Sequence, residues 1–121
     1  MPETVEILEM LRRGLEVSKA TYELTATSIP PEIFGMSSPL RRVAEAIPAN
    51  LAEAAESASH REAVPFAQHA LESSYEVDTL LSALAKSETE LPPDVVALQE
   101  KLADVAERIA SYIESQGGVG V

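Results

Sequence analysis

The two histidines, His60 and His69, are the first residues to test for metal chemistry. Dinuclear metal sites in helical bundles need a Glu three residues before each histidine, because positions i and i+3 project together into the core. Ser57 and Phe66 occupy those positions instead. Glu56 stands four residues before His60, but an isolated pair beside a chain break is typical of a surface contact. We therefore expect no metal site.

Other catalytic constellations are also missing from the sequence. The chain has no cysteine, which excludes thiolate metal sites and cysteine nucleophiles. It contains no Gly-x-Ser-x-Gly turn, and three of its five glycines fall in the last five residues, which leaves little for a phosphate-binding loop. An enzyme in the bundle core would have only generic carboxylates and the Glu56/His60 pair to support it. We predict no catalytic residue, no cofactor and no enzymatic activity.

Arg41 and Arg42 are the strongest candidates for a polar binding site, together with Asn50 and Glu53. Adjacent residues of a helix point about 100° apart, so at most one of the two arginines faces a given partner. One interpretation is an ion pair with an acid such as Glu45 or Glu53, or with an acid of another helix. The other is contact with an anion or RNA. The first is favoured.

Pro48 stands in the middle of a segment that otherwise favours a helix. Proline has no amide hydrogen to donate to the carbonyl of Ala44, so a kink between these residues is predicted. Asn50 follows two residues later and could bond a freed backbone group. Pro48 is interpreted first as a residue that sets the shape of the helix.

Proline, glycine and serine breaks near residues 29–35, 57–60 and 91–93 divide the chain into four segments of about 23 to 26 residues, each rich in helix-forming Ala, Leu and Glu. No segment shows the alternation of a β-strand. The expected fold is all-α: an antiparallel up-down-up-down four-helix bundle with a Pro-kinked second helix. It covers residues 1–116, and residues 117–121 form a flexible C-terminal tail.

Apolar spacing gives each helix a face. The last segment carries a heptad seam, with intervals of 3, 4, 3, 4 and 3 between Val95, Leu98, Leu102, Val105, Ile109 and Tyr112. The first segment differs, because its apolar residues cover more than one stripe: Val5, Ile7, Leu8, Met10, Leu11, Leu15, Val17 and Leu24. Two explanations stay open, a contact with another subunit or deeper burial of this helix.

The net charge of −11 bears on the partners. Residues 1–60 carry nine acids and five bases, and residues 61–121 carry eleven acids and four bases. Such a field repels phosphate backbones, although a local basic patch in the first half stays open. The acidic N-terminus does not look like a signal peptide, and no run of about 18 apolar residues predicts a membrane span. We expect a cytoplasmic protein of bacterial type with no membrane partner.

One stretch is distinctive, the sequence LRRVAEAIPANLAE at residues 40–53. It resembles the L-R-R-A…S-I-P-A-N-I-A-E-G signature of the four-helix-bundle protein family of 23S rRNA intervening sequences. YELT at residues 22–25 and FGMSSPL at residues 34–40 are similar to its upstream motifs. The expected third helix resembles the corresponding helix of the family at these positions: Arg61, Glu62, Phe66, Ala70, Leu71, Ser74, Glu76 and Thr79 to Leu81. The resemblance spans about residues 5 to 115.

This resemblance implies an antiparallel four-helix bundle, assembly into a homopentamer and no established enzymatic activity. A related branch, the accessory proteins of diversity-generating retroelements, binds nucleic acid and a reverse transcriptase through a basic ring surface. The present chain departs from the signature at Ala46 and Ala54, where the family has Ser and Gly.

The sequence thus predicts a non-enzymatic, homo-oligomeric, ring-forming scaffold or interaction protein, whose partners are copies of itself and an unidentified protein. The alternative is a nucleic-acid-associated accessory protein that binds RNA or DNA through a local basic patch, which the charge of −11 disfavours.

Overall fold

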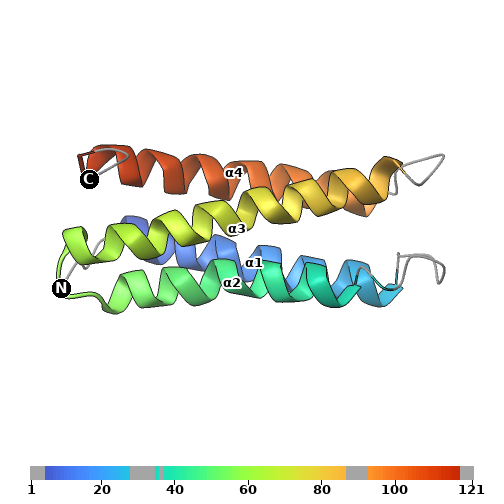
Figure 1. Ribbon diagram of the computed structural model, residues 1–121, viewed down its shortest axis with the longest axis horizontal. Coiled ribbons are helices and arrows are strands. Elements are labelled where there is room, and N and C mark those ends of the chain that lie inside the picture. The colour runs from blue at the N-terminus through green and yellow to red at the C-terminus, as the bar shows by residue number, and fades with distance from the viewer. Residues whose placement is uncertain (1–4, 28–34, 36, 87–92, 118–121) are drawn as a thin grey trace.

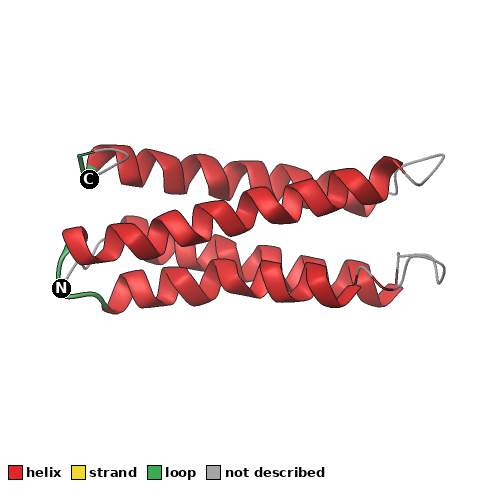
Figure 2. Ribbon diagram, in the orientation of Figure 1, coloured by secondary structure: helices red, strands yellow, loops and turns green. Residues whose placement is uncertain are grey.

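Four helices make up the fold of the computed structural model, which describes residues 5–27, 35, 37–86 and 93–117. They are α1 (Val5–Thr27), α2 (Ser37–Glu56), α3 (His60–Lys86) and α4 (Pro93–Ser115) (Figure 1). No strand occurs in these residues (Figure 2). The predicted all-α class is confirmed.

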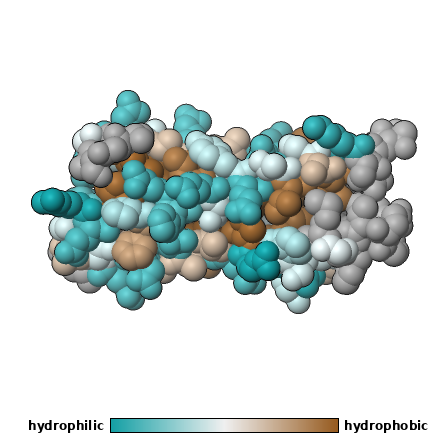
Figure 3. Space-filling model, viewed as in Figure 1, coloured by the Kyte–Doolittle hydropathy of each residue, from teal (hydrophilic) through white to brown (hydrophobic). Residues whose placement is uncertain are grey.

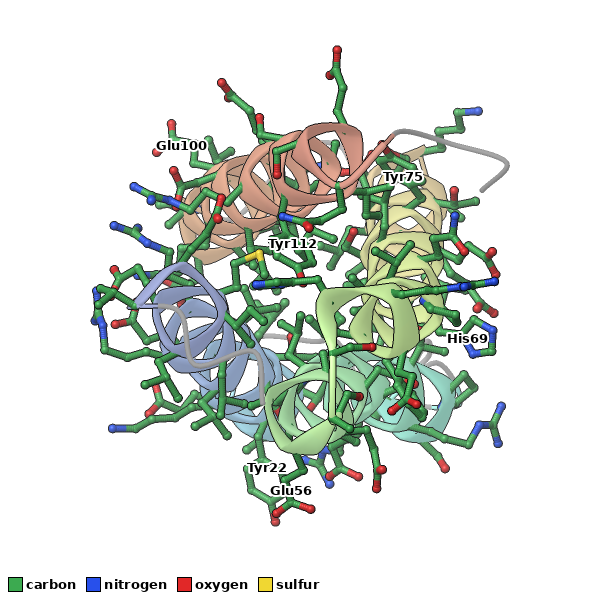
Figure 4. The ribbon with its side chains drawn as sticks, turned by 90° about the vertical axis from the view of Figure 1, so that its left-hand side faces the viewer. Tyr22, Glu56, His69, Tyr75, Glu100 and Tyr112 are labelled. Carbon is green, nitrogen blue, oxygen red and sulfur yellow. The ribbon has the colours of Figure 1, made fainter. Side chains whose placement is uncertain are left out.

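The helices pack as neighbours around a common axis. Each helix packs against the next one in the chain, and α4 closes the bundle against α1. The end-on view shows them at the four corners of a square (Figure 4). Consecutive helices run in opposite directions, as short connections require, so the bundle is antiparallel. Helices α1 and α2 therefore form one side of the square, and α3 and α4 form the opposite side.

Burial follows the predicted faces. All six seam positions of α4 are buried, and Ile113 joins them. The core sides of α2 and α3 alternate large residues with alanines, which lets the helices approach each other. Their buried apolar residues are Leu40, Val43, Ala44, Ile47, Leu51, Ala54, Ala63, Val64, Ala67, Ala70, Val77, Leu81 and Leu84.

Local capping fixes two helix ends. The Ser59 hydroxyl accepts a hydrogen bond from the Glu62 amide at 3.2 Å, and the Glu62 carboxylate accepts one from the Ala58 amide at 3.2 Å. This exchange resembles a capping box and starts α3. Beyond α4, Gly117 has a φ of 108°, a conformation that favours glycine and ends a helix. Residues 118–121 of the predicted tail lie outside the described residues.

Among the helices described, none is both long enough and apolar enough to cross a membrane.

Candidate interaction surfaces

Helix α1 exposes a row of large apolar side chains. Leu8, Leu15 and Tyr22 are 57%, 54% and 56% exposed, and intervals of seven place them on one side of the helix. We call these three residues the α1 stripe. Ile7 and Val17 are fully buried on the core side. Deeper burial of α1 within its own bundle therefore does not explain the wide apolar surface of this segment. The other explanation, contact with another subunit, stays a prediction.

Gly14 brings α1 close to α2 behind the stripe. A Cβ at Gly14 would lie 3.2 Å from Leu51 Cδ1, 3.3 Å from Ile47 Cγ2 and 3.5 Å from Pro48 Cα. Pro48 is buried at this crossing, and α2 continues through it. Pro48 thus contributes to helix packing, while the bend it favours stays a prediction.

Arg41 holds the far end of the α1 stripe in place. Its Nε donates a hydrogen bond to Thr25 Oγ1 at 2.6 Å, and its guanidinium lies 4.0 Å from the centroid of the Tyr22 ring. A cation over an aromatic face is attracted by the negative charge of the ring surface. Among the described residues Arg41 forms no ion pair with an acid, and it binds a hydroxyl and a ring of α1 instead.

The remaining candidate residues do not join Arg41. Arg42 and Glu53 are exposed. Asn50 donates a hydrogen bond from Nδ2 to the carbonyl of Ala46 at 2.8 Å. This is not the carbonyl of Ala44, to which Pro48 has no amide hydrogen to donate. Across the described ranges, no hydrogen bond or ion pair links either arginine to Asn50 or Glu53.

On the opposite side, α3 and α4 leave a groove. Two adjoining hollows of about 340 Å³ and 590 Å³, which share Tyr75 and Ala110 in their walls, together make up a depression. Apolar surface is visible between these two helices (Figure 3). Small or apolar residues form its walls: Leu71, Tyr75, Ala103, Ala106 and Ala110. Four acids line it as well: Glu72, Asp78, Glu107 and Glu114. We call this depression the α3/α4 groove.

His60 and Tyr112 form a polar contact that sequence reasoning missed. His60 Nδ1 and the Tyr112 hydroxyl are 2.7 Å apart, and Tyr112 lies among the four helices with no exposed surface (Figure 4). Burial raises the pKa of Tyr112 above its usual value of 10.0, with a smaller contribution from the charge of Glu6. Glu56 ends α2 and His60 begins α3, so they share no helix. The described residues hold no cluster of three or more His, Asp or Glu side chains suited to a metal.

A set of ion pairs occupies several basic residues. Arg12 and Arg13 both bind Glu9, and Arg13 also reaches Asp104 of α4 at 2.7 Å. Hydrogen bonding from Arg12 lowers the pKa of Glu9 to about 2, helped by the charges of both arginines. The pairs within α1 follow from i,i+3 and i,i+4 spacing. The contact between Arg13 and Asp104 depends on the closure of α1 against α4, so no local pattern predicts it.

The fold and these surfaces define an all-α bundle with an exposed apolar row on one side and an acid-lined groove on the other. The sequence matches the family of the 23S rRNA-intervening sequence protein over residues 6–111. The chain therefore belongs to this family, as the LRRVAEAIPANLAE motif indicated. No curated protein matches the chain.

Proposed function

We propose that the protein is a non-enzymatic scaffold that assembles with copies of itself into a ring, of five subunits as the family resemblance implies, and presents that ring to a protein partner. The α1 stripe is the observation that carries this proposal. Three large side chains, each more than half exposed in one row, keep apolar surface in contact with water. Contact with another copy removes that cost, about 25 cal/mol for each Å² of apolar surface.

The distribution of charge supports a protein partner over nucleic acid. Arg12, Arg13 and Arg108 bind acids of α1 and α4, and Arg41 stacks on Tyr22. Phosphate binding would require these arginines to give up their present partners. Four of the nine lysine and arginine residues are thus engaged within the chain, and the net charge of −11 disfavours attraction of a phosphate backbone.

Sedimentation velocity of the full chain at micromolar concentration tests the assembly. The expected result is a single species several times heavier than the 13.0 kDa chain. A homogeneous monomer would refute the scaffold proposal. Titration of labelled RNA at low salt, where electrostatic attraction is greatest, tests the alternative, and we expect no binding.

A further inference from the structure

We infer that the α1 stripe of one copy docks in the α3/α4 groove of the next, so that the copies associate head to tail. This inference rests on the proposed self-assembly and specifies the two surfaces that carry it. The occupant of the groove is thus a second copy of this chain.

Shape is the first argument. The stripe from Leu8 to Tyr22 is about 21 Å long, and the part of α4 that lines the groove, from Gln99 to Glu114, is about 22 Å long. The stripe is a row of projecting side chains. Three alanines of α4, Ala103, Ala106 and Ala110, line the groove among larger residues and leave room for such a row between helices.

Charge is the second argument. Lys19 lies four residues after Leu15 and three before Tyr22, so it is on the same side of α1, and it is exposed. Arg41 covers the ring of Tyr22. Lys19 and Arg41 thus place positive charge beside the second half of the stripe, where the carboxylates of Glu16 and Glu23 also lie. Among the described residues that line it, the groove presents four carboxylates and no lysine or arginine. In an acidic chain, this pairing of opposite local charges favours one orientation and disfavours contact between two acid-lined grooves.

The positions of the surfaces determine the kind of assembly. Tyr22 and Tyr75 lie on opposite sides of the bundle (Figure 4). Two different surfaces on opposite sides make a heterologous contact, in which each copy uses its stripe on one neighbour and its groove on the other. Such contacts close into a ring when the rotation between neighbouring copies divides a full turn, as the proposed ring requires, and otherwise extend into an open filament.

Substitutions at two exposed positions distinguish this head-to-tail arrangement from a two-fold arrangement in which both copies use the same surface. Leu15→Glu places a carboxylate in the stripe, and Ala103→Glu places one in the groove. Both positions are exposed, so both variants should fold with wild-type circular dichroism. We expect each variant alone to sediment as a monomer. An equimolar mixture should give a 1:1 dimer, because the intact stripe of Ala103→Glu binds the intact groove of Leu15→Glu.

Three controls make the result decisive. A chain carrying both substitutions should stay monomeric when it is mixed with a second batch of itself. Tyr75→Glu should behave as Ala103→Glu does, and Ala49→Glu, which adds a charge at an exposed position outside both surfaces, should keep the wild-type mass. Because a closed ring gains avidity that one contact lacks, the mixture is measured over a concentration series.

The outcomes distinguish the two proposals. A monomeric wild type overturns the scaffold proposal and this inference together. An oligomeric wild type overturns this inference alone if Ala103→Glu keeps the wild-type mass, or if the mixture forms no dimer at any concentration in the series.

Discussion

The two sides of the bundle use small residues in opposite ways. Between α1 and α2, Gly14 lies directly against Ile47 and Leu51, and the helices close tightly. Between α3 and α4, Ala103, Ala106 and Ala110 border an open groove. A small residue that faces a large neighbour brings helices together, whereas small residues at the edge of a contact leave a hollow. Burial, and not residue type, decides which of these occurs.

The same difference separates the apolar residues that remain outside the core. On the α1 side three large side chains project in a row, whereas the groove side combines receding alanines of α4 with the exposed ring of Tyr75. A single chain thus carries a projection and a depression of similar length. This asymmetry is what a head-to-tail contact needs, since a two-fold contact would need one self-complementary surface.

The largest expected effect on stability comes from replacing one small residue on each side of the bundle with leucine. Gly14→Leu places a side chain where a single Cβ already lies 3.2 Å from Leu51. Overpacking should cost about 3 kcal/mol, of which better helix propensity restores about 1, so unfolding free energy should fall by about 2 kcal/mol. Ala106→Leu, which points into the groove, should change it by less than about 0.5 kcal/mol when both variants are made in the Leu15→Glu background, which is expected to be monomeric, so that blocking the groove does not alter assembly.

Urea denaturation followed by circular dichroism measures both variants at one protein concentration, because self-association makes apparent stability depend on concentration. Equal losses of stability in the two variants would contradict the contrast between a closed and an open pair of helices.

A smaller effect concerns the polar contact that holds the open pair at one end. Tyr112→Phe removes the hydroxyl that lies 2.7 Å from His60 Nδ1. The unfolding free energy should fall by about 1 kcal/mol at neutral pH, the net value of a buried hydrogen bond. Tyr75→Phe is the matched control, because that hydroxyl is on an exposed residue, and it should leave stability unchanged within about 0.5 kcal/mol.

The alkaline range gives a second test of Tyr112. Its pKa is raised in the folded protein, so above about pH 10 the unfolded chain loses this proton more readily than the folded one. The stability that Tyr112 contributes is complete below pH 10 and declines as pH rises toward its folded pKa. As the pH is raised from about 9 to 11, the unfolding free energy of Tyr112→Phe should therefore fall less than that of Tyr75→Phe, which keeps Tyr112. Parallel pH profiles would show that Tyr112 is not shielded from water.

Sequence reasoning reached the fold because helix number, helix faces and chain breaks are local properties. The heptad seam of α4 and the excess of apolar residues in α1 both follow from spacing within one segment. The partners of single side chains do not. Arg41 lies over Tyr22, and His60 meets Tyr112, only because antiparallel packing brings distant positions together. The α3/α4 groove was missed for the same reason. In the sequence its alanines indicate only a strong preference for helix, and they do not show that they border a hollow.

The smallest expected effect lies between the two sides, where Arg13 of α1 binds Asp104 of α4 at 2.7 Å. Both side chains are partly exposed, so the pair should contribute about 0.5 kcal/mol, and salt should screen it. A double-mutant cycle of Arg13→Met and Asp104→Asn isolates this coupling from the contact that Arg13 also makes with Glu9. The coupling energy should fall toward zero at about 1 M salt. A coupling that is unchanged by salt would place the pair in a shielded position and would mean that α1 and α4 close more tightly than their exposure indicates.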